Sequence, residues 1–395
     1  MERRYDIDRL RILLFALLVP HHAATGFVAF GEPIYGLVND RLAGPGLELA
    51  IYFSHGWRLP SLFVIAGIGT AFATRRGVTG GFIGKRMWRL LVPVVFGVLF
   101  LNMLSGYALY RAGAVTSGVA AVPAGPALGF FAFWWEWLSH PRLNHVHHLW
   151  FLLSLAAYTL ILWPVMRLRE RIAGWTVSAP ALLAAIVLVV TFIAITAKPF
   201  GAAVAGEGYQ FPWYLGIFAG GYLIGIHAER VLAVLERRAF WFLGLGVLTF
   251  ATEVVLLGAG LEGSEAYGVA LAEGGWAAQG IAPAYGALPV AFAAVEGANA
   301  WMWAFAVMGL AARYLRRPGR ALSWLTRAVF PFYVLHFPVV LIGLSMLAQV
   351  AWPWGWELLL LIVGTYLVTG LVYLVALQTG RAVVLIGGRA VATAP

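Results

Sequence analysis

The sequence contains no cysteine, and only 11% of its 395 residues are Asp, Glu, Lys or Arg. The lack of cysteine excludes thiolate catalysis, cysteine-ligated metals and iron–sulfur chemistry. A soluble domain is typically about 25% charged, and so little charge cannot cover a water-exposed surface. We therefore exclude a soluble enzyme and a disordered chain. The P-loop of nucleotide hydrolases, the GxSxG turn of serine hydrolases and the HExxH zinc motif are also missing.

Apolar residues, by contrast, make up 62% of the chain. Apolar windows of about 20 residues are long enough to cross the hydrocarbon core of a membrane as helices. We predict one all-α, polytopic membrane domain over residues 1–395, a bundle of about ten transmembrane helices. The predicted spans are roughly 10–30, 47–73, 87–110, 148–166, 178–197, 212–227, 240–260, 285–312, 328–349 and 354–378.

The placement of the 27 Lys and Arg residues orients these spans. Most of them lie in segments on the same side as the N-terminus, so the positive-inside rule predicts that both termini are cytoplasmic. The net charge of +10 is then mainly a topology signal, and nucleic acid is not expected as a partner. The expected location is the cell (cytoplasmic or inner) membrane, with membrane lipid around a multi-pass protein.

Two further patterns concern packing and the membrane surface. Four glycines of the sixth span predict close contact with a neighbouring helix: Gly216, Gly220, Gly221 and Gly225. The predicted outer loop 111–147 contains the aromatic stretch 130–137. It is typical of a helix lying in the membrane interface, and a platform for stacking sugars is the alternative.

Ionisable residues inside spans are expensive, which makes them candidates for function. The first span carries Asp8, Arg11, His21 and His22. In a continuous helix, Arg11 and His22 are three turns apart on one face, about 16 Å along the axis, with Asp8 on the same side. The alternative is an Arg that reaches the membrane surface and a His satisfied by a neighbouring helix.

The second and fourth spans carry the next candidates. His55 and Arg58 are an i, i+3 pair, and Pro60 is expected to kink or interrupt the helix after them. The fourth span begins with three histidines, ending at His148, followed by Trp150. Three histidines in four positions suggest a metal site, but no further ligands stand at a recognised spacing. We therefore expect no metal there.

The remaining candidates are a histidine, two acids and a basic cluster. His336 lies in a late apolar span, as do the acids Glu253 and Glu296 in two others. Either acid is a candidate proton acceptor or the counter-ion of Arg58. The cluster Lys85, Arg86 and Arg89 lies at the predicted cytoplasmic surface, where it would attract a phosphate-bearing cosubstrate.

Five stretches in sequence order resemble motifs of the transmembrane acyltransferase 3 family. They are Arg11-x10-His22 with Asp8 before it, His55-Gly-Trp-Arg58-Leu-Pro60 with Phe63-Val-Ile-Ala-Gly67 after it, Phe82-Ile-Gly-Lys85-Arg86-Met-Trp-Arg89, His148-Leu-Trp150-Phe-Leu, and Phe332-Tyr-Val-Leu-His336-Phe-Pro. The second is similar to the branch that includes glucan succinyltransferases and O-acetyltransferases, although Ala66 stands where the family usually has Ser.

The resemblance implies transfer of an acyl group, acetyl or succinyl, from cytoplasmic acyl-CoA to a hydroxyl of an extracytoplasmic glycan, lipid or small molecule. Acetyl-CoA or succinyl-CoA would be a cosubstrate, with no tightly bound cofactor. The resemblance implies functional roles for Arg11 and His22, and it extends less closely to Arg58 and His148.

The residues themselves fit this O-acyltransferase chemistry. His22 is a natural base or acyl relay, because neutral imidazole is the titratable group most easily kept in a membrane. Arg58 or Arg11 would supply positive charge to the thioester carbonyl or to CoA phosphates. We assign catalysis to His22, Arg11 and Arg58, substrate binding to Asp8, His55, His148, Trp150 and His336, and CoA binding to Lys85, Arg86 and Arg89. The alternative is a proton-coupled secondary transporter or flippase.

Overall fold

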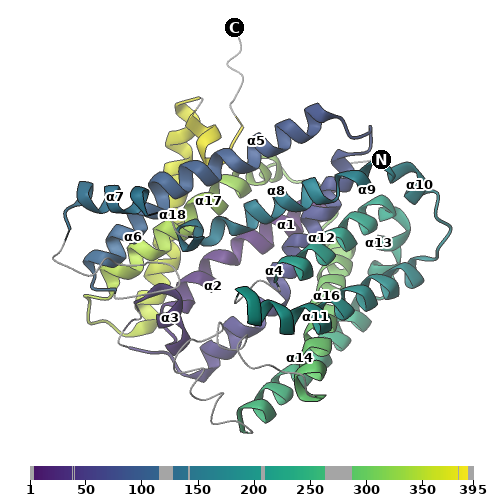
Figure 1. Cartoon of the computed structure of the whole chain (residues 1–395), viewed down its shortest axis with the longest axis horizontal. Helices are drawn as coiled ribbons and strands as arrows, with labels where there is room; N and C mark the ends of the chain where they lie inside the picture. Colours follow the sequence, from purple (N-terminus) through teal and green to yellow (C-terminus); the bar gives the residue numbers. More distant parts are fainter. Residues whose placement is uncertain are drawn as a thin grey trace. The chain divides into compact units, whose positions relative to one another are not determined.

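The computed structural model of the chain describes residues 4–37, 39, 41–114, 128–140, 143–205, 210–262, 287–380 and 382–389. All regular structure in these ranges is helical, and they contain no strand. The prediction of an all-α protein is confirmed. Figure 1 shows the helices in chain order from purple to yellow.

Seven segments of the described chain are long and apolar enough to cross a membrane, or eight if one bent pair of helices counts as a span. The chain is therefore a polytopic membrane protein, as predicted. The seven are α4 (Pro45–Ala73), the run Gly80–Arg111 of α5 (Gly80–Phe96), η2 (Gly97–Leu101) and α6 (Asn102–Arg111), and parts or all of α11 (Ala179–Ala205), α14 (Ala239–Glu262), α16 (Ala287–Tyr314), α17 (Leu322–Leu347) and α18 (Trp354–Gln378). The bent pair is α12 (Gln210–Ile226) and α13 (Ala228–Arg237), at 101° to each other.

The other two predicted spans, 10–30 and 148–166, fall on shorter helices. The first corresponds to α1 (Tyr5–Ala16) and α2 (Leu18–Thr25), and the second to α8 (Trp150–Ile161) with α9 (Trp163–Arg167). The total of ten spans and the side on which the termini lie stay predictions. The remaining short helices are η1 (Ala29–Gly31), α3 (Glu32–Tyr35), α7 (Phe130–Ser139), η3 (Leu143–Leu149), α10 (Arg169–Ala173) and η6 (Ala382–Ile386).

The first span is not the continuous helix that the sequence predicted, because α1 ends at Ala16 and α2 begins at Leu18. Pro20 has no N–H to donate to the carbonyl of Ala16 four residues earlier. That carbonyl instead accepts a hydrogen bond of 2.5 Å from the hydroxyl of Tyr366 on α18. The helix therefore breaks one turn before His22, and the shared face of Arg11 and His22, which assumed an unbroken helix, stays a prediction.

Pro60 does not interrupt the second span, so that part of the expectation is wrong. α4 runs without a break for 29 residues and contains Pro60 within it. A single proline removes one helical hydrogen bond, to the carbonyl of Gly56, and the other turns of so long a helix remain bonded. His55 and Arg58 therefore lie on one uninterrupted helix.

The chain divides into two compact units, which we describe separately. The first unit comprises the described residues of 1–14, 52–83 and 157–322, and the second those of 15–51, 84–156 and 323–395. In the first unit α16 packs against α11, α13 and α14, and α11 also packs against α12. The pair α14 and α16 can be followed side by side in Figure 1.

Glycines let two helices of the first unit approach closely, as the sequence predicted. A Cβ atom built on Gly221 of α12 would lie 2.3 Å from the carbonyl oxygen of Val64 on α4. In the opposite direction, a Cβ on Gly67 would lie 2.2 Å from the carbonyl oxygen of Phe218. Both distances are too short for a real side chain, so α4 and α12 pack backbone to backbone.

The second unit is built around α17. An apolar cluster joins α17 to α2, α3, α6 and α18, and includes Phe27, Tyr35, Leu109, Phe337, Leu344 and Leu361. Leu344 packs so closely on α2 that a Cβ on Gly26 would lie 2.6 Å from it. This cluster fixes α2 and α17 against each other, and both helices carry histidines.

Candidate functional site

The predicted site residues are distributed over both units. Those in the first unit are Asp8 and Arg11 of α1 and His55 and Arg58 of α4. Those in the second unit are His22 of α2, Lys85, Arg86 and Arg89 of α5, His148 of η3, Trp150 of α8 and His336 of α17.

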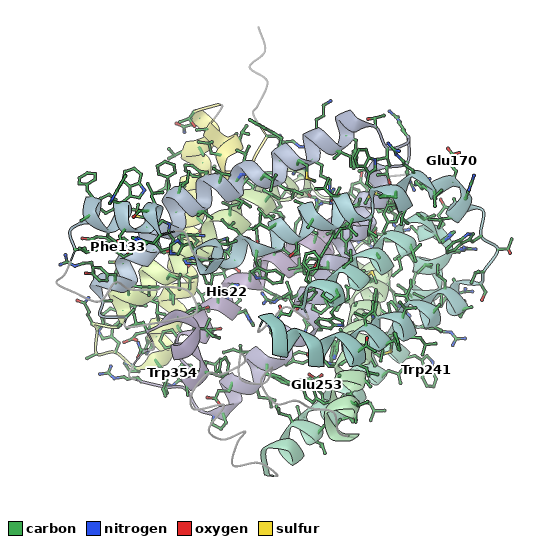
Figure 2. All side chains as sticks on the ribbon, viewed as in Figure 1. His22, Phe133, Glu170, Trp241, Glu253 and Trp354 are labelled. Carbon is green, nitrogen blue, oxygen red and sulfur yellow. The ribbon has the colours of Figure 1, made fainter. Side chains whose placement is uncertain are left out.

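Three of the predicted histidines meet in the second unit, although they are far apart in the chain. The ring of His336 lies 5.4 Å from that of His22 and 5.2 Å from that of His148, measured between centroids. Phe337 contacts both outer members, at 4.8 Å from His22 and 5.0 Å from His148. His148 and His336 are buried, and His22 is partly buried. We call His22, His148 and His336 the histidine cluster; Figure 2 labels His22 on its helix.

Tyr35 holds the His22 ring in one tautomer. The Tyr35 hydroxyl donates its single proton to the carbonyl oxygen of His22, at 3.1 Å. The same hydroxyl lies 3.4 Å from Nδ1 of the His22 ring, and its oxygen can only accept there. Nδ1 of His22 is then the protonated nitrogen, which leaves the lone pair of the neutral ring on Nε2. α2 thus presents a basic nitrogen of His22 that is oriented by Tyr35.

Backbone carbonyls of α17 fix the tautomers of the other two rings. His336 donates from Nδ1 to the carbonyl oxygen of Tyr333, at 2.7 Å, so its lone pair is on Nε2. His148 donates from Nε2 to the carbonyl oxygen of Val334, at 3.2 Å, so its lone pair is on Nδ1. That Nδ1 is buried and has no hydrogen-bond partner among the described residues. All three imidazoles therefore carry a defined basic nitrogen, as proton transfer requires.

The backbone just before His148 is strained. His147 has φ 47° and ψ −140°, and it is the only non-glycine residue with positive φ in the described part of the chain. Such a conformation costs about 1–3 kcal/mol and persists only where the surroundings enforce it. Here the side chain of Asn102 donates to two carbonyl oxygens, of His145 at 2.9 Å and of Val146 at 3.1 Å.

An aromatic helix supports the same segment from the other side. The ring of Trp137, on α7, stacks on the ring of His145 at 3.6 Å between centroids and 11° between planes. The indole N–H of Trp137 donates to the carbonyl oxygen of Val98 in η2, which is a π-helix, at 3.0 Å. π-Helical turns are frequent at functional sites. The position of α7 in the membrane interface, and its alternative role as a platform for stacking sugars, stay predictions.

The predicted CoA-binding residues lie on one helix of the second unit. Lys85 and Arg89 are exposed, and Arg86 is partly buried. The guanidinium of Arg89 lies over the ring of Phe330, 5.4 Å from its centroid. Three cations within five residues produce a concentrated positive surface at the start of α5. Trp150, by contrast, is partly buried at the first position of α8.

In the first unit the charged candidates include one ion pair within a helix. Arg11 donates to Asp8 at 3.1 Å, as the i, i+3 spacing predicts. Arg58 is only 2% exposed in the middle of α4, whereas His55 is partly buried. A guanidinium at such a position is costly in a membrane, which keeps Arg58 a functional candidate.

Glu253, labelled in Figure 2, is the centre of a second polar cluster in the first unit. One oxygen of this buried carboxylate accepts from the hydroxyl of Tyr52 at 2.6 Å, and the other accepts from the amide of Asn299 at 2.7 Å. Thr249 in turn donates to the amide oxygen of Asn299 at 3.0 Å. These bonds tie together α4, α14 and α16, so Glu253 has a definite structural role beside the two roles considered for it. Glu296 is partly buried on α16.

The described residues contain no group of three or more His, Asp or Glu side chains arranged to hold a metal ion. His145 stacks on Trp137, which also contacts His147, whereas His148 is bonded to α17.

Sequence reasoning missed several residues around the histidine cluster. Tyr35 and Phe337 are not charged or amide side chains within an apolar span, so nothing in the sequence selects them. Asn102 does, since it is a polar side chain in the apolar span 87–110 and is completely buried. An amide in such a span needs a partner, and that signal would have been enough to select it.

A family model described as "Acyltransferase domain" matches residues 4–374, nearly the whole chain. Neither curated proteins nor solved structures gave a significant match.

Proposed function

The chain belongs to the acyltransferase 3 family, and from that premise we propose that it transfers an acyl group from cytoplasmic acyl-CoA to a hydroxyl of an extracytoplasmic glycan or related acceptor. The family match and the apolar helices make the protein a multi-pass membrane acyltransferase. The CoA donor, the acetyl or succinyl group and the glycan acceptor belong to the proposal.

The observation that carries the proposal is the histidine cluster. O-acyl transfer requires a base that removes the proton of the acceptor hydroxyl while its oxygen attacks the thioester carbon. His22 is suited to this step because its Nδ1 is engaged by Tyr35 and its Nε2 carries the lone pair. A neutral imidazole is also the form that a low-dielectric site favours.

The proposed reaction balances as follows. The acceptor oxygen bonds to the acyl carbon, and Nε2 of His22 takes the hydroxyl proton. The carbon–sulfur bond of acyl-CoA then breaks, and CoA leaves as a thiol after it receives that proton. His336, whose ring lies 5.4 Å from His22, would stabilise the transient imidazolium or pass the proton on. If His22 instead carries the acyl group, Nε2 attacks the thioester carbon and the carbon–sulfur bond breaks, so that CoA leaves as a thiolate. The acceptor oxygen then takes the acyl group from Nε2, and the hydroxyl proton goes to the CoA thiolate.

Cationic residues complete the proposal. As the family resemblance implies, Arg11 or Arg58 would supply positive charge to the thioester oxygen as it becomes an oxyanion, or to the CoA phosphates, with Asp8 orienting Arg11 through their ion pair. Lys85, Arg86 and Arg89 would bind the phosphates of CoA. His55, His148, Trp150 and His336 are the proposed contacts to the substrates.

Labelled donors test the proposal. Membranes that contain the protein are incubated with radiolabelled acetyl-CoA or succinyl-CoA, and glycan, lipid and small-molecule fractions are counted. We expect label in one fraction and an equal amount of free CoA, both lost in the His22→Ala variant. If no acyl-CoA is consumed while the protein carries protons across proteoliposome membranes, the transporter alternative replaces this proposal.

A further inference from the structure

The proposed reaction does not explain why the backbone of η3, which carries His148, is strained. η3 contains the one non-glycine residue with positive φ in the described chain, His147, directly before His148. With φ 47° and ψ −140°, His147 has a conformation that glycine adopts readily and that a side chain with a Cβ atom disfavours. Without external support, η3 would relax by rotating this peptide, and the His148 ring would move with it.

Asn102 supplies that support. Its amide is completely buried, and its two N–H groups are directed at two consecutive carbonyl oxygens, of His145 and Val146. These are the two carbonyls that precede His147. The Asn102 amide thus fixes the orientation of the two peptide groups before His147. The path from these peptides to His148 then runs through the φ and ψ of His147.

The other side of the strained residue is fixed as well. Nε2 of His148 donates to the carbonyl of Val334, and the hydroxyl of Tyr333 donates to the carbonyl of His148 itself. The segment is therefore held at both ends, by Asn102 before His147 and by α17 after it. This over-determination allows an unfavourable backbone conformation to persist.

We propose that Asn102 is a positioning residue of the acyltransferase: it enforces the strained backbone at His147 and thereby fixes the His148 ring in the histidine cluster. Asn102 needs to touch neither substrate. The inference deepens the proposed function, because it assumes that the placement of His148 matters for transfer.

We predict that the effect of replacing Asn102 on kcat depends on the residue at position 147. Asn102→Leu keeps a similar volume but removes both N–H donors, so it should lower kcat by about tenfold or more while the KM for acyl-CoA changes little. In a His147→Gly background the strain is absent, since glycine accepts this conformation. There, Asn102→Leu should lower kcat by no more than about threefold, which makes the two changes non-additive.

Two further measurements make the test specific. Ser105→Ala removes another hydrogen bond of a buried side chain on α6, from its hydroxyl to the carbonyl of Asn102 at 3.0 Å, and should leave kcat near wild type. The same four-variant cycle of Asn102 and His147 is followed by melting temperature, which reports the strain without any reliance on activity.

The outcomes are decisive. An equal loss of kcat on Asn102→Leu in both backgrounds overturns the proposal, and so does coupling that is seen in melting temperature but not in kcat. Failure of the proposed function looks different: His22→Ala would keep its activity, whatever the cycle of Asn102 and His147 shows.

Discussion

Removal of the Tyr35 hydroxyl tests how much the orientation of the His22 ring contributes to the rate, because the imidazole itself is kept. In Tyr35→Phe, the His22 carbonyl loses a hydrogen bond of 3.1 Å and Nδ1 loses its acceptor at 3.4 Å, while the buried ring of residue 35 remains in place. Loss of one such bond costs about 0.5–1.5 kcal/mol of stability. If the same free energy is lost from the orientation of the ring, the rate falls about 2- to 13-fold. That is far less than loss of the base itself, at about 10²–10⁴-fold.

Tyr366→Phe is the matched control for this variant. It also removes a phenol hydroxyl that donates to a backbone carbonyl, that of Ala16, at 2.5 Å in the same unit. Both variants should lower the melting temperature to a similar extent, but only Tyr35→Phe should lower kcat in the acyl-CoA assay. If both variants transfer acyl groups at the wild-type rate, the argument for the His22 tautomer is refuted.

Two other predictions concern the basic cluster and the packing of the first unit. Replacing Lys85, Arg86 and Arg89 together by Gln should raise the KM for acyl-CoA more than it lowers kcat. Added salt should raise the wild-type KM, because exposed charges are screened. Steady-state kinetics at two salt concentrations check this, and an unchanged KM in the variant would mean that these residues only set the topology. Gly221→Val should destabilise the protein by about 1–3 kcal/mol, because its Cβ would lie 2.3 Å from the backbone oxygen of Val64. The control is Gly244→Val, at a glycine with open space around it. Equal melting temperatures of the two variants in thermal unfolding would refute the close packing of α4 and α12.

Composition and periodicity were sufficient for the class of fold. Each predicted span has a helical counterpart, because apolar windows of this length have few alternatives in a membrane. They were insufficient where one residue changes the outcome. Pro20 breaks the first span with the help of Tyr366, whereas Pro60 leaves α4 continuous. Whether a proline ends a helix depends on what satisfies the freed carbonyl, which local sequence does not contain.

The candidate site was predictable as a set of residues and only partly as an arrangement. The cost of burying His22, His148 and His336 in apolar spans selects them from the sequence alone. Their meeting around Phe337 depends on how α2, η3 and α17 pack in the second unit, which no periodicity encodes. The positive φ of His147 was likewise invisible, since a non-glycine residue with positive φ is uncommon and nothing in the local sequence marks this position.

The rate of acyl transfer by His22→Ala, compared with His21→Ala, tests the central claim most directly. His21 is the neighbouring residue on α2 and, like His22, is partly buried. Its ring lies 5.3 Å from that of His22, measured between centroids. With labelled acyl-CoA, we predict that His22→Ala loses about 10²–10⁴-fold in kcat at a near-wild-type melting temperature, and that His21→Ala is affected much less. If His22→Ala keeps more than about a tenth of the wild-type rate, well above that range, the imidazole of His22 is structural and the claim is contradicted.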